Sequence, residues 1–260
     1  MNVATSLPAL SRPPVGSVVQ AVAVLRFLGS RQDGAGVTAI ARALGIGPSS
    51  CFNVLRTLVA EDMVAFDPVT KSYTLGLGTI DLARRALRRD AVVQAAEGPM
   101  AALADAHDAA IGLWRLAPRD RLVLAALAES EAATRIHMVV GQRQPAAAGA
   151  TGRAMLATRR LDDGAIAAAF ADLRWQNAPS LADYRAEIRA TEARGFAVDV
   201  DQINRGIATV AAAIPDESGV ARFVLSASMF AGRDAAALDL IGARVHETAQ
   251  ALGRAISRAA

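Results

Sequence analysis

Residues 37–75 read VTAIARALGIGPSSCFNVLRTLVAEDMVAFDPVTKSYTL, and this stretch decides the fold of the N-terminal part of the chain. Apolar residues recur at helical spacing from Val37 to Leu44, which predicts a short amphipathic helix. Gly45 ends that pattern, and Pro48 suits the first turn of a second helix because its missing N–H would have no partner there. The stretch therefore predicts two helices joined by a tight turn.

The second predicted helix has one apolar and one polar face. Its apolar positions are Cys51, Val54, Leu55 and Leu58. The other positions carry small or hydrogen-bonding side chains, which suit a groove lined by base edges and phosphates: Ser49, Ser50, Asn53, Arg56 and Thr57. A polar to basic outer face on the second helix is typical of a DNA-binding helix-turn-helix. A salt bridge from Arg56 to Glu61 or Asp62 is the alternative for that side chain.

A short hairpin follows the second helix. Val64–Phe66 and Ser72–Leu75 are expected to be its strands, with the turn at Asp67–Thr70 and Lys71 near the tip. This hairpin completes a winged helix-turn-helix. The residues expected to contact DNA are Thr38, Ser49, Ser50, Asn53, Arg56, Thr57, Thr70 and Lys71.

Composition indicates a folded chain of two domains. Its 260 residues are 53% apolar and 20% charged, which supplies a sizeable core and argues against global disorder. No stretch reaches the roughly 18 apolar residues of a membrane span, so no membrane partner is expected. The single cysteine excludes an internal disulfide and suits a reducing cytoplasm. The net charge of +3 is by itself a weak basic signal.

Changes in pattern divide the chain into four segments. A helix at Ser17–Ser30 should complete a three-helix core, and a helix that starts at Thr79 should connect two domains. Arginines cluster on the connecting helix and form either a solvated face or a contact with phosphate or another subunit. The expected segments are a disordered tail at 1–14, the winged helix-turn-helix at 15–77, the linker helix at 78–92 and an effector domain at 93–260.

The last segment alternates short apolar runs with turns and helical stretches. Strands are expected at Ala110–Arg115, Leu122–Ala128, Arg135–Val140, Gly206–Ile214 and Val220–Ser228. Helices are expected at Thr151–Arg159, Asp163–Ala171, Leu181–Arg194 and Asp234–Arg258. Hairpin-linked strands with helices to one side predict an antiparallel α+β domain.

No catalytic set is recognisable. The three histidines stand far apart and there is one cysteine, so neither a metal site nor a cofactor is expected. Gly149–Ala154 predicts the start of a helix. Its free N–H groups either bind a small anion, or the glycines are there only to allow close packing. Ser226 and Ser228 share one face of a strand, where their hydroxyls would be satisfied by the protein or by a ligand. Asp199 lies near a strand end and could equally be a surface turn residue.

Taken in order and spacing, these motifs resemble the IclR family of bacterial transcriptional regulators over nearly the whole chain from Ser17. Besides the winged helix-turn-helix, the likeness is carried by Gly149–Ala157, Arg194–Asp199, Ala211–Ile214 and Leu225–Ser228. The resemblance implies an N-terminal DNA reader, a linker helix and a C-terminal domain related to GAF and PAS sheets. It also implies a homodimer, often a dimer of dimers, on a palindromic or pseudo-palindromic operator in double-stranded DNA.

The resemblance further implies a pocket for a small organic acid between the sheet and its covering helices. The positions that match its lining are Ile136, Met138, Ala150, Thr151, Asp199, Thr209, Ser226 and Ser228. Hydroxyls and helix N–H groups would hold a carboxylate or carbonyl, and aliphatic side chains would hold the carbon skeleton. The chain departs from the family pattern at Asn53, Arg153, Gln202 and Thr209, where arginine, lysine, glutamate and cysteine are more frequent.

We therefore expect a cytoplasmic DNA-binding regulator, not an enzyme, whose operator affinity changes when a small acid binds. Two alternatives belong to other classes: a small-molecule-binding enzyme with a vestigial N-terminal domain, and an interaction module whose helix-turn-helix docks protein. The missing catalytic set argues against the first. The neutral to basic face of the second helix argues against the other.

Overall fold

The computed structural model of the chain describes residues 13–88, 90–131, 136–159, 161–216 and 218–257. The chain divides into two compact units after Leu87. Residues 1–12 of the tail that we expect to be disordered lie outside the described residues. None of the described helices is both long and apolar enough to cross a membrane.

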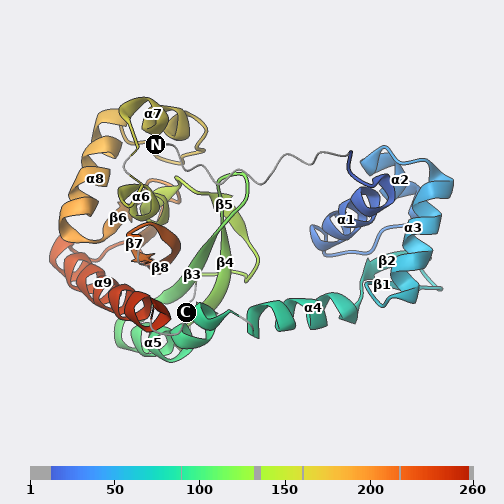
Figure 1. Cartoon of the computed structure of the whole chain (residues 1–260), viewed down its shortest axis with the longest axis horizontal. Helices are drawn as coiled ribbons and strands as arrows, with labels where there is room; N and C mark the ends of the chain where they lie inside the picture. Colours follow the sequence, from blue (N-terminus) through green and yellow to red (C-terminus); the bar gives the residue numbers. More distant parts are fainter. Residues whose placement is uncertain (1–12, 89, 132–135, 160, 217, 258–260) are drawn as a thin grey trace. The chain divides into compact units, whose positions relative to one another are not determined.

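The described part of the first unit contains three helices, a two-stranded hairpin and nearly all of a fourth helix (Figure 1). Val24, Ile40 and Leu55 are fully buried in its core. Its elements, with the helix that follows them, are α1 (Gly16–Gly29), α2 (Val37–Leu44), α3 (Pro48–Ala60), β1 (Val64–Asp67), β2 (Ser72–Leu75) and α4 (Leu77–Arg88). The predicted helix-turn-helix, the hairpin that forms its wing and the helix after it are confirmed.

Local chemistry sets the boundaries of these elements. α2 ends at Gly45, whose φ of 63° is a left-handed conformation that glycine adopts without strain. Pro48 stands in the first turn of α3, where no intrahelical partner for its nitrogen exists. In the hairpin, the Asp67 carboxylate accepts hydrogen bonds from the Val69 N–H and the Thr70 hydroxyl at 2.8 and 2.7 Å. The side chains of the wing thereby close its own turn.

The second unit is built on a six-stranded antiparallel sheet with the order β5-β4-β3-β8-β7-β6. Its strands are β3 (Ala110–Ala117), β4 (Arg121–Ala128), β5 (Arg143–Pro145), β6 (Ala197–Val200), β7 (Ile207–Pro215) and β8 (Ala221–Phe230). Its helices are α5 (Ala91–His107), α6 (Gly149–Ala157), α7 (Asp163–Ala171), α8 (Leu181–Arg194) and α9 (Ala235–Ser257). The predicted α+β class is confirmed.

Helices cover both faces of this sheet (Figure 1). α5 and α9 pack on one face, with Met100 and Ile241 in the shared core. α6 packs on the other face through residues that include Met155. Because neighbouring residues of a strand point to opposite faces, Leu225 of β8 joins the core under α9, and Ser226 points to the face that α6 covers.

One predicted strand, at Arg135–Val140, is wrong, because the described part of that segment forms no strand. The outer neighbour of β4 is instead β5, later in the chain. Before β5 the chain turns at Gly141, whose φ is 94° and whose N–H donates to the Leu124 carbonyl at 2.8 Å. Ile136 and Met138 face a cavity, so their alternation reflects a loop with an apolar side and not a sheet ladder.

α6 is a short helix that is buried on every side. Each residue from Gly149 to Leu156 is buried. A Cβ on Gly152 would lie 2.0 Å from the carbonyl carbon of Ala147, so only glycine lets the chain that leads into α6 pass this close. The Tyr184 hydroxyl of α8 donates to the Ala147 carbonyl at 2.6 Å. These contacts fix the position of the N-terminus of α6.

Candidate functional site

The polar face predicted for α3 points to solvent within its unit. Cys51 and Leu55 are fully buried, whereas Asn53 and Arg56 are exposed. All eight residues that the sequence suggests for DNA contact are exposed: Thr38 in α2, Ser49, Ser50, Asn53, Arg56 and Thr57 in α3, and Thr70 and Lys71 in the wing. The helical phase inferred from the sequence is therefore the one that the structure has.

Hydrogen bonding leaves the longer side chains of this face available. The Thr57 hydroxyl donates to the Asn53 carbonyl of its own helix at 3.0 Å. Within the described part of the chain Arg56 forms no ion pair, and the salt bridge to Glu61 or Asp62 that we considered is absent there. The Arg56 guanidinium can therefore bond to a partner outside the unit.

A cavity of about 360 Å³ lies in the second unit, on the face of the sheet that α6 covers. It brings together all eight residues that the sequence suggests for effector binding: Ile136, Met138, Ala150, Thr151, Asp199, Thr209, Ser226 and Ser228. The remaining lining residues are Trp114, His137, Gln142, Gln144, Ala148, Gly149, Ile203, Asn204 and Ile207. Segments far apart in sequence thus converge on one space.

The sheet supplies three hydroxyls to this cavity, each held by a neighbour. The Trp114 indole N–H donates to Oγ of Ser226 at 2.9 Å, and Ser226 lies 3.4 Å from the Gly112 carbonyl, to which it donates. The hydroxyls of Thr209 and Ser228 share a hydrogen bond of 3.1 Å between β7 and β8. These bonds fix the hydroxyls in place before any ligand arrives.

The first turn of α6, Gly149–Thr151, forms another wall of the cavity. No side chain caps this helix, so its first N–H groups are available to a ligand. The Thr151 hydroxyl donates to the Ala148 carbonyl at 3.1 Å and accepts a hydrogen bond from the Gln144 amide. A helix N-terminus of this kind favours a negatively charged or carbonyl oxygen.

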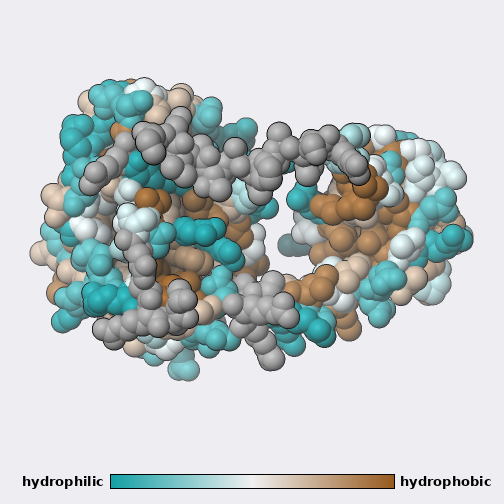
Figure 2. Space-filling model, in the orientation of Figure 1, coloured by the Kyte–Doolittle hydropathy of each residue, from teal (hydrophilic) through white to brown (hydrophobic). Residues whose placement is uncertain are grey.

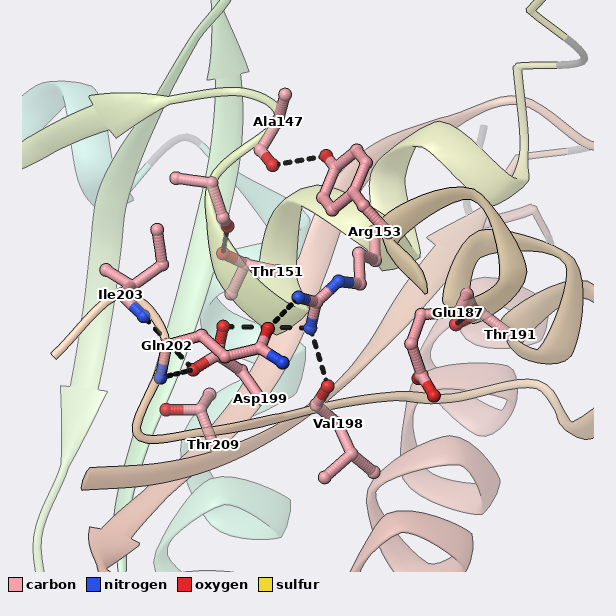
Figure 3. A network of polar contacts seen from close by, with 12 residues as sticks. Ala147, Thr151, Arg153, Glu187, Thr191, Val198, Asp199, Gln202, Ile203 and Thr209 are labelled. Carbon is pink, nitrogen blue, oxygen red and sulfur yellow. Dashed lines mark hydrogen bonds and ion pairs between the residues drawn. The ribbon is translucent and has the colours of Figure 1, made fainter. Parts of the chain in front are cut away.

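A buried ion pair adjoins this wall (Figure 3). The side chain of Arg153 is fully buried, and its Nη1 lies 3.6 Å from Oδ2 of Asp199. The guanidinium also donates to the Val198 carbonyl at 2.7 Å and to the Gln202 side chain. Its central carbon lies 5.3 Å from the ring centroid of Tyr184, a cation–π arrangement. One carboxylate, two neutral oxygens and an aromatic face thus hold the positive charge.

Burial opposes both charges of this pair. It raises the pKa of the Asp199 carboxyl, and the nearby Arg153 guanidinium opposes that rise. It lowers the pKa of the Arg153 guanidinium, and Asp199 opposes that fall. The backbone N–H groups of Gln202 and Ile203 donate to Oδ1 of Asp199 at 3.3 and 3.4 Å and favour its ionised form. Asp199 thus brings a partly compensated negative charge to the cavity.

A winged helix-turn-helix joined to a separate α+β domain with such a cavity defines a class, that of ligand-binding transcriptional regulators. The sequence matches the profile of the IclR helix-turn-helix domain over residues 17–68 and that of the bacterial transcriptional regulator IclR C-terminal domain over residues 84–257. The chain belongs to the IclR family.

Known proteins agree with this assignment. The chain is 29% identical over 211 residues, 78% of its own length and 80% of the relative, to the glycerol operon regulatory protein of Streptomyces coelicolor. It resembles the crystal structure of an IclR transcriptional regulator from Alicyclobacillus acidocaldarius, with a TM-score of 0.83 and 26% identity over 94% of this chain and 100% of that one. An IclR homologue from Microbacterium hydrocarbonoxydans, complexed with 4-hydroxybenzoate, has a TM-score of 0.77 and 17% identity over 92% and 99% of the two chains.

The lining residues that the sequence did not reveal depend on irregular or long-range features. Trp114 is the exception, because it alternates regularly with Leu113 along β3, and the register shift opposite it leaves Ala125 of β4 unpaired. Asn204 and Gln142 lie in loops. On the solvent-facing side of α3, the sequence analysis did not single out Phe52, which is 48% exposed. Its helical phase, one turn before Arg56, could have revealed it.

Removal of one partner of the buried ion pair should destabilise the second unit. We expect Arg153→Met to lower the free energy of unfolding by about 3–5 kcal/mol, because Asp199 then keeps a buried charge without its counterion. Adding Asp199→Asn should recover most of this loss. Urea unfolding followed by circular dichroism measures both changes.

The matched control for this experiment is Arg159→Met. Arg159 pairs at 3.5 Å with Asp120, whose side chain is 85% exposed, so its loss should cost less than about 1 kcal/mol. If the double variant were no more stable than Arg153→Met alone, the pair would not be the source of the effect.

Proposed function

We propose that this protein is a cytoplasmic regulator whose affinity for its operator changes when a small organic acid binds in the cavity of the second unit. The observation that carries the proposal is the convergence of an uncapped helix N-terminus and fixed hydroxyls on one cavity of about 360 Å³. Such a cavity suits a compact ligand whose carboxylate or carbonyl meets N–H and O–H groups. The complex of the Microbacterium homologue with 4-hydroxybenzoate supports an acid as the ligand class.

The first unit would supply the operator contacts. In the major groove, Asn53 suits adenine and Arg56 suits guanine or a phosphate. The other α3 residues and Thr38 would bond to the backbone or base edges beside them. Thr70 and Lys71 of the wing would contact the backbone or the minor groove, because both are exposed at the hairpin.

A second copy of the chain is part of this proposal. Figure 2 shows apolar surface in the region of α1, whose N-cap residue Val15 is 66% exposed and whose Val18 and Val19 are 59% and 52% exposed. Exposed apolar residues gathered in this way suit burial against another protein surface. A symmetric dimer, or a dimer of dimers, would present α3 helices to the half-sites of a palindromic or pseudo-palindromic operator.

The hydrogen bonds of the cavity favour binding over turnover. An activated hydroxyl nucleophile needs a general base as its partner. Among the described residues, the hydroxyls of Thr151, Ser226 and Ser228 bond to amide, indole, hydroxyl or carbonyl groups, and not to a histidine, lysine or carboxylate. We therefore assign the cavity to a regulatory ligand.

Replacement of the exposed arginine of α3 should weaken operator binding. We expect Arg56→Ala to cost about 1–3 kcal/mol in binding free energy if its contact is bidentate to a base. Fluorescence anisotropy at fixed salt, with a duplex selected from a random pool by the wild-type protein, measures this loss. Arg189→Ala, an exposed arginine on α8 in the other unit, removes the same charge and should leave affinity unchanged. Equal affinity of Arg56→Ala and wild type would remove Arg56 from the reading face.

Removal of the two β8 hydroxyls should separate ligand response from DNA binding. We expect Ser226→Ala with Ser228→Ala to abolish the effect of an inducing acid, while operator affinity without ligand stays nearly the same. The acid is chosen as the one that most raises the melting temperature in a panel of organic acids. Ser218→Ala, at an exposed turn, should keep the full response. A normal response in the double variant would show that the polar site lies elsewhere.

A further inference from the structure

One oxygen of the Asp199 carboxylate is left without a hydrogen-bond donor. Oδ1 accepts from two backbone N–H groups, but Oδ2 accepts no hydrogen bond from any described residue. The residue is only 5% exposed, and it lines the cavity. An ionised oxygen that is buried without a donor is costly, and such atoms are normally satisfied by a bound partner. This atom therefore indicates where a ligand donates a hydrogen bond.

The N-terminus of α6 lies directly beside that oxygen. A Cβ built on Gly149 would be 3.4 Å from Oδ2 of Asp199, so the first turn of the helix is an immediate neighbour of this oxygen, which is ion-paired with Arg153 at 3.6 Å but accepts no hydrogen bond from a described residue. The N–H groups of this turn attract a negative oxygen, whereas Oδ2 attracts a hydrogen. A ligand that contacts both groups therefore needs a hydrogen-bond acceptor and a hydrogen-bond donor within a few ångströms of each other.

We propose that the cavity selects a 2-hydroxy carboxylic acid, whose carboxylate meets the first turn of α6 and whose adjacent hydroxyl donates to Oδ2 of Asp199. This inference rests on the proposed function, in which a small acid is the effector. In such an acid the hydroxyl is on the carbon that bears the carboxylate, which matches the close spacing of the two protein groups.

Two related ligand classes fit less well. A plain carboxylate would place its charge beside that of Asp199 with no hydrogen between the oxygens. A 2-amino acid would supply hydrogens, but its ammonium would compete with Arg153, whose Nη1 is already 3.6 Å from the same oxygen. A neutral hydroxyl satisfies Oδ2 without bringing a second cation to it.

Matched acids that differ at one position test this selectivity on the full chain. Isothermal titration calorimetry would compare lactate with propionate and alanine, and mandelate with phenylacetate and phenylglycine. We expect at least one hydroxy acid to bind about tenfold or more tightly than both of its partners, since the lost bond is to a charged oxygen. Equal or tighter binding of the deoxy or amino partner would overturn the inference, as would the absence of binding by any hydroxy acid.

The Asp199→Asn variant tests the assigned atom. It should reduce the preference for the hydroxy acid over the deoxy acid to within about twofold, whereas Asp172→Asn, at an exposed position, should keep it. Unchanged preference in Asp199→Asn would move the hydroxyl site elsewhere. Operator binding is measured on the same samples: if a ligand of another class releases the operator, the regulator proposal stands and the hydroxy-acid class fails.

An independent observation concerns the reading face of α3. Phe52 is 48% exposed, three residues after Ser49 and four before Arg56, so it borders the polar face along one edge. A large aromatic side chain left in water on such a face loses free energy unless a partner covers it. In the major groove the apolar group that base pairs present is the 5-methyl of thymine.

We infer that Phe52 is a specificity-determining residue that packs on a thymine methyl in each operator half-site. This inference also depends on α3 entering the major groove, as the proposed function states. The polar neighbours Ser49 and Arg56 would bond to the groups on either side, and Phe52 would exclude water from the methyl. The contact favours thymine over cytosine or uracil at one position without a hydrogen bond.

Uracil substitution isolates this contact because it removes only the methyl group. In duplexes selected by the wild-type protein, replacing the contacted thymine by uracil should weaken binding by about fourfold. The Phe52→Ala variant should bind the thymine duplex more weakly and no longer distinguish thymine from uracil. Equal binding of thymine and uracil duplexes by the wild type at every position would overturn the inference. If Arg56→Ala loses all specific binding, a weaker binding of the uracil duplex by the wild type still supports the inference about Phe52.

Discussion

The ion pair between Arg153 and Asp199 is the interaction around which the second unit is arranged. Withdrawing two charges from water is costly, and the contact recovers that cost only with further hydrogen bonds. The guanidinium obtains them from Val198 of β6 and from Gln202 in the loop after it, and Tyr184 of α8 covers it. A single side chain of α6 thus joins a helix, an edge strand, a loop and a covering helix. The ion pair thus connects two walls of the cavity, α6 and the strand that carries Asp199.

The same ion pair helps to determine which hydrogen-bonding groups the cavity offers to a ligand. Asp199 turns one oxygen to the backbone of its own loop, and its second oxygen is shared between Arg153 and the cavity. The sheet hydroxyls are held in the same manner by the Trp114 indole and by each other. A ligand therefore meets groups whose directions are already set, which reduces the ordering cost of binding. Selectivity then follows from which hydrogen-bonding positions remain open.

The parts of this picture that the sequence predicts are those governed by local periodicity. Helical phase alone separates Cys51 and Leu55 from Asn53 and Arg56, and strand alternation alone places Ser226 and Ser228 on one face. The resemblance to a family supplied Asp199, Thr209 and the apolar pair at 136 and 138. Neither periodicity nor the resemblance predicts loop geometry and register: the segment before Gly141 looks like a strand, and the register shift that leaves Ala125 of β4 unpaired has no sequence mark. The sequence did not predict the burial of Arg153 either, because the groups that surround this side chain are distant in sequence.

A ligand can change operator affinity only if it binds one conformational state of the protein better than another, and the coupling is then reciprocal. The loop after β6 is the element best placed to differ between such states. It touches the ligand space through Ile203, it is held to Asp199 and Arg153, and the carbonyl of Gln202 accepts the N–H groups of Gln176 and Asn177 from the segment between α7 and α8. A donor bound to Oδ2 of Asp199 would compete with Arg153 for that oxygen, and Asp199 also holds the loop through its other oxygen. The energy needed is small, since a coupling of roughly 1–3 kcal/mol suffices for regulation, and one charge-assisted hydrogen bond has that magnitude.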